Sequence, residues 1–455
     1  MVASNSCEII ELFEEGFFEQ LTRKVYTPLQ KNSAIKHIEI FTTASKTTKI
    51  NFEEGFVKDA HQKKSAGIGL RIIDSSGREG MTFTSDFSDS ALEMIMHHAV
   101  KMMKAATRNP EFRNIAFPSS SYVPVSGTYD STLENICPED INEIIQPIFA
   151  LKTREYTPRG LSGGFSASIG GAYIWNSNGV SIWDKFSTAS VSAEVSVVEK
   201  NNPSGGFDWA SACQLKDVDV EKVANTSYDM AIRGLNKTSL KTGEYPVILS
   251  PLATAYFLID PLTTSINAER VQNQMSFLGE YLHKPLGDKN LSIVDDPHIP
   301  GKLGTESFDA EGIATKPLTI VKDGILEAFY HNTFTAGKEC DCVSNGHASR
   351  GSYNTPLGIS NNNLIMSPGS KSWDSIVSDV KKGVYLEYSG DSPDYITGDF
   401  SGLIMTGYLI EDGVIGPALS ETMMSIIIIE AFSRIEEIPK ERNWIDEAYV
   451  PWLKI

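Results

Sequence analysis

Residues 292–332 read SIVDDPHIPGKLGTESFDAEGIATKPLTIVKDGILEAFYHN and hold the clearest turn and strand signals of the chain. Residues 318–321 and 325–330 are β-branched and aromatic runs on either side of Lys322-Asp323-Gly324. Because Asp-Gly supplies the positive φ angles that a tight turn requires, we predict a β-hairpin here. The segment therefore favours antiparallel sheet as the basis of the fold.

Four carboxylates precede this hairpin in a segment that we predict to be loop-like. Asp295 and Asp296 come first, and Asp309 and Glu311 follow within the run FDAEG. Carboxylates gathered in this way can bind a metal, a cationic group of a substrate or only backbone amides. Asp309 and Glu311 occupy alternate positions, so in an extended segment both point to the same side. That arrangement suits amide capping in a loop, or a rim that holds a peptide backbone.

A metal cluster is one interpretation of Asp295, Asp296 and His298, with His283 as a further ligand. Two nearby prolines favour the other interpretation, in which these residues form turns. Cys340 and Cys342 are the one closely spaced cysteine pair, and they lack the second Cys/His pair of a structural zinc site. We interpret them as loop thiols and expect no metal ligands and no cofactor.

The length of 455 residues predicts two or three domains. Turn-rich sequence and element order divide the chain into an N-terminal α/β domain (1–115), a middle β-rich segment (116–240) and a C-terminal domain (241–455). Hairpin signals occur in all three. We therefore expect an α+β protein, with antiparallel sheet dominating the N-terminal region and a large mixed β-rich C-terminal domain.

Composition excludes several function classes. The net charge is −18 and no basic run is visible, which argues against nucleic-acid binding. No apolar run is long enough to span a bilayer, and the acidic start of the chain differs from a signal peptide. The five cysteines are odd in number and mostly far apart, as in a reducing compartment. We expect a cytoplasmic protein that binds neither nucleic acid nor membranes.

The remaining segments predict short elements. Helices are indicated at about residues 7–25, 88–106, 138–154, 220–236, 250–259, 267–281 and 372–382. Short strands of an antiparallel meander are indicated at residues 38–42, 49–52, 67–73 and 81–84, and further strands at 160–169, 172–176, 180–188 and 189–198. Asn178-Gly179 predicts a hairpin turn, and we interpret Gly163-Gly164 and Gly170-Gly171 as bulges or turns.

Motif order along the chain resembles the TldD/PmbA family. The motifs of its C-terminal domain are matched by Asp295-Asp296-Pro297, Phe308-Asp309-Ala310-Glu311-Gly312, the hairpin at 321–326, Ser392-Pro393-Asp394-Tyr395-Ile396-Thr397-Gly398-Asp399-Phe400-Ser401, and Leu409-Ile410-Glu411-Asp412-Gly413. Its first domain is matched by Gly67-Ile68-Gly69-Leu70-Arg71 with Gly80 and Thr84-Ser85-Asp86. The family, also called modulator of DNA gyrase or peptide-maturation protein, implies a two-subunit cytosolic zinc protease that acts on unfolded or modified peptides.

The residue types decide which branch of that family this chain resembles. The metal-bearing branch uses HExxxH on a helix and a cysteine near the C-terminus, because a zinc hydrolase needs imidazole ligands and a carboxylate that activates water. None of the eight histidines is followed by Glu, and no cysteine follows Cys342. Residues 252–257, where the motif should fall, read LATAYF, which we interpret as apolar packing. The chain therefore resembles the PmbA-like (TldE-like) branch, and we expect it to have no catalytic residues of its own.

The resemblance implies a peptide cleft and a partner. We assign the cleft to the following residues: Asp295, Asp296, Phe308, Asp309, Glu311, Gly312, Asp394, Gly398, Asp399 and Phe400. The partner is a metal-bearing TldD-like subunit, a second copy of this chain, or both. Two other functions stay open: an autonomous hydrolase with an unrecognised site near Asp295, and a non-enzymatic homodimeric scaffold that binds peptides.

Overall fold

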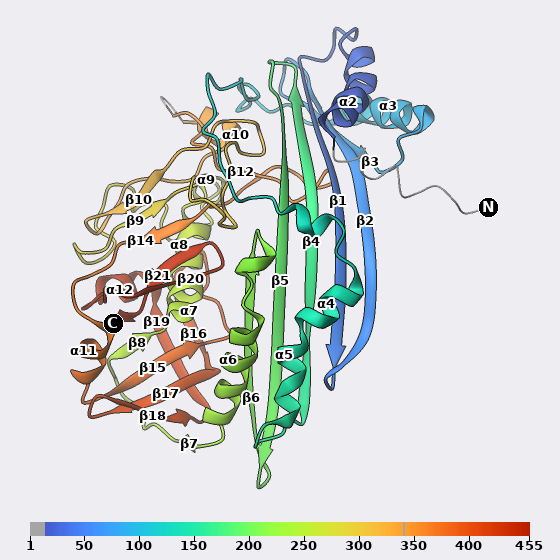
Figure 1. Cartoon of the computed structure of the whole chain (residues 1–455). Coiled ribbons are helices and arrows are strands. Elements are labelled where there is room, and N and C mark those ends of the chain that lie inside the picture. The colour runs from blue at the N-terminus through green and yellow to red at the C-terminus, as the bar shows by residue number, and fades with distance from the viewer. Residues whose placement is uncertain (1–13, 340–341) are drawn as a thin grey trace.

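The computed structural model describes residues 14–339 and 342–455. A tall six-stranded sheet stands beside a β-rich C-terminal half (Figure 1). The sheet has the order β3-β2-β1-β4-β5-β6, and all neighbouring strands are antiparallel. Its strands are β1 (His37–Glu53), β2 (Phe56–Ile73), β3 (Glu79–Thr84), β4 (Gly160–Asn176), β5 (Ser181–Glu199) and β6 (Asn202–Ala212).

These strands are much longer than the sequence predicts. Residues 38–42 and 49–52 belong to one continuous strand, β1, because the intervening small and polar residues pair with both β2 and β4. Glu54 and Gly55 form the turn between β1 and β2, and both have positive φ angles. Asn178-Gly179 likewise lies in the turn between β4 and β5, where the N–H of Asn176 bonds the carbonyl of Val180. The antiparallel pairing of the predicted meander is confirmed, but the prediction divided the continuous strand β1 into two strands.

The interpretation of the glycine pairs as bulges or turns was wrong. Gly163 and Gly170 lie inside β4, and the register of β4 with β5 runs past them without a shift. A Cβ on Gly170 would overlap the ring of Phe186, and one on Gly163 would overlap the carbonyl of Ser192. These glycines therefore allow close packing within a continuous strand.

Helices cover one face of the long sheet. Ile40 and Leu70 pack under α2 (Glu15–Leu29) and α3 (Asp89–Ala105), and Ile50 packs under α4 (Pro138–Ile144) in a second cluster. The other elements on this half are α5 (Gln146–Phe149), α6 (Val220–Arg233) and the short turns η1 (Ser131–Glu134), η2 (Ala150–Thr153) and η3 (Leu215–Asp217). The predicted helix at 138–154 is thus broken into pieces, and residues 7–13 of the first predicted helix lie outside the described residues.

The C-terminal half contains two mixed sheets and two small antiparallel pairs. One sheet has the order β11-β10-β9-β14-β21-β20 and the other β22-β8-β15-β17-β18-β7, while β12 pairs with β13 and β16 with β19. The bounds are β7 (Lys237–Thr238), β8 (Val247–Leu249), β9 (Ile293–Asp295), β10 (Leu318–Lys322), β11 (Ile325–Leu326), β12 (Ala348–Ser349), β13 (Gly358–Ile359), β14 (Leu364–Met366), β15 (Lys382–Tyr388), β16 (Asp399–Ile404), β17 (Thr406–Glu411), β18 (Val414–Leu419), β19 (Thr422–Ile427), β20 (Arg442–Ile445), β21 (Ala448–Pro451) and β22 (Leu453–Lys454). The predicted α+β class, with an antiparallel N-terminal sheet and a mixed C-terminal part, is confirmed.

A helical run crosses the core of this half. It consists of α7 (Pro251–Ala253), the π-helical η4 (Thr254–Ile259) and α8 (Asp260–Ser265). Ser250 caps the run by accepting the N–H of Ala253, as Ser-Pro at a helix start favours. The other helices are α9 (Ala268–Gln272), α10 (Thr333–Gly337), α11 (Trp373–Ser378) and α12 (Ile428–Ser433). The helices predicted at 267–281 and 372–382 are therefore real but shorter.

The hairpin within residues 292–332 is confirmed. β10 and β11 pair across Asp323 and Gly324, whose φ angles are 49° and 79°. Asp295 is not in a loop as predicted, because it ends strand β9 between β10 and β14. None of the described helices is long and apolar enough to cross a membrane. Because β1 to β6 form one sheet, strands on both sides of residue 115 pair with each other.

Candidate functional site

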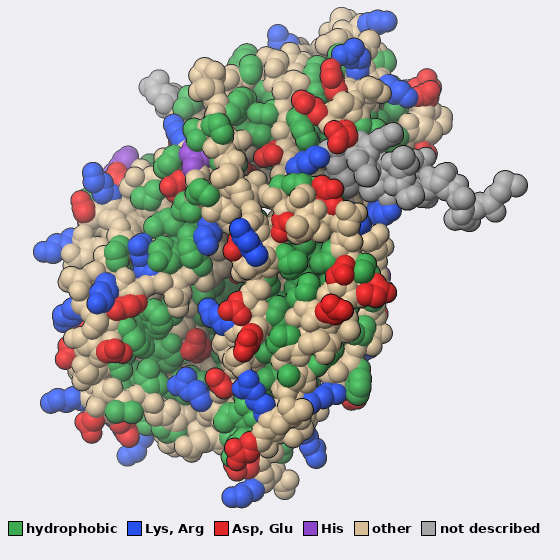
Figure 2. All heavy atoms as spheres, in the orientation of Figure 1, with side chains coloured by type: hydrophobic (Ala, Val, Ile, Leu, Met, Phe, Trp, Pro, Cys, Tyr) green, Lys and Arg blue, Asp and Glu red, His purple; other side chains and the backbone are tan. Residues whose placement is uncertain are grey.

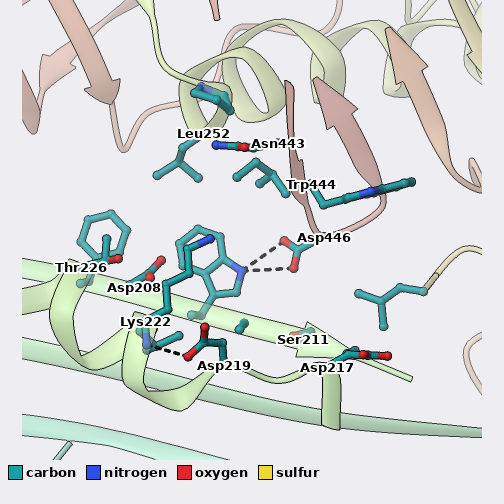
Figure 3. Close-up of a pocket in the computed structure, with 18 of the residues that line it drawn as sticks. Asp208, Ser211, Asp217, Asp219, Lys222, Thr226, Leu252, Asn443, Trp444 and Asp446 are labelled. Carbon is teal, nitrogen blue, oxygen red and sulfur yellow. Dashed lines mark hydrogen bonds between the residues drawn. The ribbon is translucent and has the colours of Figure 1, made fainter. Parts of the chain in front are cut away.

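A groove lies between the edge of the long sheet and the C-terminal half. It has a volume of about 360 Å³ and is bordered by β6, α6, α7 and the turn between β20 and β21 (Figure 3). Successive side chains of β6 point to opposite sides. Gly206 and Asp208 therefore face α6, whereas Trp209 reaches the C-terminal half.

Asp446 holds two aromatic side chains of the groove in place. Trp209 donates its indole N–H to this carboxylate, with Nε1 3.2 Å from either oxygen, as the dashed lines to Asp446 in Figure 3 show. Tyr256 donates its hydroxyl to the same carboxylate at 2.8 Å. The Trp209 ring also stacks on Phe207 and meets Tyr256 edge-on. Three segments distant in sequence thus build one aromatic wall around a carboxylate.

Acidic side chains outnumber basic ones along the groove. Asp208, Asp217, Asp219, Glu387 and Asp446 line it, against Lys222 and Lys302. Burial raises the pKa of Asp208 to about 6, although hydrogen bonds from the backbone of Trp209 and the side chain of Thr226 lower it in part. Burial also raises the pKa of Glu387. Aromatic rings beside carboxylates suit an extended peptide that carries apolar and cationic side chains.

A second cavity, of about 390 Å³, lies further along the same side of the sheet. Leu303 lines both cavities, and Phe308, Asp309 and Arg350 line the second one. Burial raises the pKa of Glu306, which also lines it, and the charge of Asp309 adds to the shift. In Figure 2 charged side chains of both signs gather along the boundary between the long sheet and the C-terminal half.

Phe308 and Asp309 are the predicted cleft residues that the structure places at a cavity. Asp309 is buried, and its Oδ1 accepts the N–H groups of Glu311 and Ile313 at 2.9 Å while its Oδ2 accepts that of Ala348 at 3.1 Å. Glu311 is also buried and accepts the N–H of Thr333 at 2.8 Å. Burial raises the pKa of both carboxyls. These bonds match the amide-capping arrangement considered from the sequence.

Gly312 completes this turn with a φ of 79°. Its carbonyl accepts the hydroxyl of Tyr122 at 2.9 Å, and a Cβ here would overlap the side chain of Val180. The turn therefore packs directly against the long sheet.

Asp295 and Asp296 do not gather with His298 and His283 into a ligand set among the described residues. Asp295 is completely buried and accepts the hydroxyl of Tyr330 at 2.8 Å. Asp296 accepts the N–H of His298 at 2.9 Å, and His283 lies on the surface 3.4 Å from Glu327. Asp296 therefore stabilises a turn, and Asp295 forms a buried hydrogen bond in the core.

The predicted residues of segment 394–400 lie apart from the Asp309 turn. Asp394 caps a turn by accepting the N–H groups of Ile396 and Thr397. Gly398 has a φ of 79°, and exposed Asp399 begins β16. Phe400 is buried against Phe257, with ring centroids 4.8 Å apart. Peptide binding by these residues stays a prediction.

Sequence reasoning missed Asp208, Trp209 and Asp446 entirely. It also interpreted Tyr256 as part of an apolar helix face, whereas 39 % of this side chain is exposed and its hydroxyl bonds Asp446. No local motif marks these residues, because they meet only through pairing and packing over long sequence separations.

Three family models together match most of the chain. They are described as PmbA/TldA metallopeptidase domain 1 (residues 38–103), central domain (138–235) and C-terminal domain (242–455). The chain belongs to the PmbA/TldD metallopeptidase family. Among its curated relatives, a metalloprotease of Methanocaldococcus jannaschii is 24 % identical over 86 % of this chain and 87 % of its own length. A metalloprotease PmbA homologue of Buchnera aphidicola is 21 % identical over 85 % and 84 %.

Solved structures share the PmbA/TldD fold over nearly the whole chain. A protein of Thermotoga maritima described as a modulator of DNA gyrase superposes with a TM-score of 0.86 at 19 % identity, covering 96 % of this chain and 98 % of that one. TldE of Thermococcus kodakarensis superposes with a TM-score of 0.84 at 18 % identity and the same coverage.

The metal implied by a metallopeptidase family does not fit the helical run beside the groove. The run Pro251–Ser265 contains no histidine and no cysteine. It presents Tyr256, Ile259, Asp260 and Thr263 to a small pocket of about 100 Å³ next to Asp446. These side chains do not supply the imidazole or thiolate ligands that zinc prefers.

Proposed function

We propose that this chain is the peptide-binding, PmbA/TldE-like subunit of a cytoplasmic metallopeptidase system that degrades or matures unfolded or modified peptides. The observation that carries the proposal is the helical run at the groove, which lines a substrate-sized cavity but has no histidine. In this proposal hydrolysis depends on a TldD-like partner that carries HExxxH, and the two subunits, or two copies of this chain, enclose the peptide as a dimer.

The edge of the long sheet supports binding of an extended peptide. Among the described strands, β6 pairs only with β5, so its other edge has backbone groups that are not used in the sheet. An extended peptide can pair with such an edge by main-chain hydrogen bonds, while adjacent pockets select its side chains. Trp209 lies on this strand, and the acidic groove lies directly beside it.

An autonomous hydrolase centred on Asp295 has no comparable support. The carboxylate is buried and is bonded to Tyr330 and to the N–H of Asn362. A nucleophile or metal there would have no path to a peptide. A scaffold that only binds peptides is the outcome expected if a partner's activity does not respond to this chain.

The test compares peptide hydrolysis by this chain alone, by a metal-bearing partner alone and by both together. We expect turnover only with the partner, and stronger turnover with both. Trp209→Phe removes the indole N–H and should reduce the stimulation, whereas Trp175→Phe is the control because Trp175 stacks on Tyr26 beneath the helices. Hydrolysis by this chain alone that a chelator abolishes and zinc restores would overturn the proposal.

A further inference from the structure

Three potential metal ligands meet at the end of the central hairpin segment. His331, Glu339 and Cys342 each offer one ligand atom, and these atoms lie within 4.8 Å of one another. His331 precedes α10, and the other two residues follow that helix. The sequence pattern pointed away from this arrangement, because Cys340 and Cys342 lack the second Cys/His pair of a structural zinc site.

Glu339 is oriented by a neighbouring amide. Gln272 Nε2 donates to Glu339 Oε1 at 2.9 Å and to the carbonyl of Thr335 at 2.8 Å. The other carboxylate oxygen, Oε2, lies 3.9 Å from His331 Nε2, which is too far for a hydrogen bond. An outer residue that fixes a carboxylate while leaving one oxygen free is typical of metal sites.

The backbone of His331 is held by hydrogen bonds, whereas its imidazole Nδ1 has none within the described residues. Its side chain is only 7 % exposed, and its buried Nδ1 has no hydrogen-bond partner among the described residues. The backbone around it is held by the returning loop, since Asn345 accepts the His331 N–H at 2.9 Å and Ser344 donates to its carbonyl at 3.2 Å. The imidazole is therefore presented to Glu339 and Cys342 without a competing partner.

We propose that His331, Glu339 and Cys342 bind a zinc ion at a site separate from the helical run of the family's metal-bearing branch. Imidazole, carboxylate and thiolate form a ligand set that zinc accepts in tetrahedral geometry. Ligand atoms around zinc lie about 3.5 Å apart, so the more exposed Glu339 and Cys342 side chains move inward by about 1 Å on binding. The thiol proton passes to solvent, and a water completes the coordination.

The site has a structural consequence for the cavity region. Thr333, two residues after His331, donates its N–H to Glu311 in the turn that borders the second cavity. Zinc would tie residues 339 and 342 to His331, just before α10, and so stabilise the segment that supports that turn. In this way the bound zinc would support the order of the C-terminal half next to the second cavity.

The experiment uses the full chain, reduced with a phosphine and stripped of metal. Zinc is titrated against a chromophoric chelator, and cobalt is added separately because a thiolate ligand gives it a charge-transfer absorption. We expect one equivalent of zinc, an affinity at least about 10-fold weaker in Cys342→Ser, His331→Gln and Glu339→Gln, and loss of the cobalt-thiolate band in Cys342→Ser. Cys137→Ser and His298→Gln are matched controls that should keep both.

Absence of the cobalt band in the unaltered chain, or its persistence in Cys342→Ser, would overturn the site. Glu339→Gln alters a largely exposed side chain, so it tests metal affinity even where His331→Gln does not fold. Peptide hydrolysis by the zinc-loaded chain alone would contradict the proposed function and leave the metal site standing, so the two failures are distinguishable.

Discussion

Trp209 on β6 donates its indole N–H to Asp446, which lies 237 residues later in the chain and 3.2 Å away. The bond joins the edge of the long sheet to the turn between β20 and β21. Because Tyr256 bonds the same carboxylate, Asp446 sets the positions of two aromatic side chains at once. These bonds therefore connect the two sides of the groove through one carboxylate.

We expect Asp446→Asn to weaken peptide binding and to lower the free energy of unfolding by about 1–2 kcal/mol, since two hydrogen bonds lose a charged acceptor. Asn tolerates the φ of 48° at this position, so backbone strain does not confuse the result. Urea unfolding and a peptide titration measure the two effects. Asp412→Asn is the control, because Asp412 has the same φ in an exposed turn between β17 and β18.

Asp208 should make the groove sensitive to pH. Burial raises its pKa to about 6 from an ordinary value near 4, so the folded state binds an extra proton between these values and stability falls as the pH rises through 6. Asp208→Asn should therefore be more stable than the unaltered chain by about 1–3 kcal/mol at pH 8 and equally stable at pH 4. Urea unfolding across this range checks it, with exposed Asp217→Asn as the control. An equal difference at both pH values would contradict the assignment.

The sequence predicted those parts of the fold that depend on local chemistry. The Asp323-Gly324 hairpin, the Asn178-Gly179 turn and the start of a helix at residue 250 all follow from residues adjacent in the chain. The lengths of β1 and β4 could not be predicted in this way, because stretches such as 43–48 have little strand character and are extended only through pairing on both sides.

The candidate site was less predictable for the same reason. Asp309 was predicted as a cleft residue and lines the second cavity, but its bond from the N–H of Ala348 becomes visible only when that distant residue is placed beside it. Asp446 was not singled out from the sequence, because its role depends on contacts with Trp209 and Tyr256, which come from distant segments. Side chains whose function comes from tertiary contact carry no signature in their own segment.

Gly69 allows the long sheet to lie close to the C-terminal half, because it has no side chain. A Cβ at this position of β2 would overlap the carbonyl oxygen of Tyr353. We expect Gly69→Ala to lower the free energy of unfolding by about 1–3 kcal/mol through overpacking, as measured by denaturant unfolding. Gly205→Ala in the same sheet is the control, since the nearest atom to its new Cβ would be 3.7 Å away. Equal losses in both variants would show that the approach of Tyr353 is not the cause.

The turn at residues 308–312 offers the sharpest separation of a structural role from peptide binding. Asp309 and Glu311 accept four backbone N–H groups between them, and both are buried. If capping is their role, Asp309→Asn and Glu311→Gln should each lower the free energy of unfolding by about 1–3 kcal/mol, because each puts an amide group where carboxylate oxygens accept hydrogen bonds. If they hold peptide, melting should be unchanged and binding should weaken.

Glu311 does not line the cavity, so we expect Glu311→Gln to lower stability only. Asp309 does line it, so we expect Asp309→Asn to lower stability and to weaken peptide binding. Gly312→Ala is the positive control for instability, because its φ of 79° and the adjacent Val180 side chain leave no room for a Cβ. Thermal melts and a peptide titration of the same variants distinguish the structural role from the peptide-binding role. Unchanged melting together with unchanged binding in both acid variants would defeat the structural and the binding role alike.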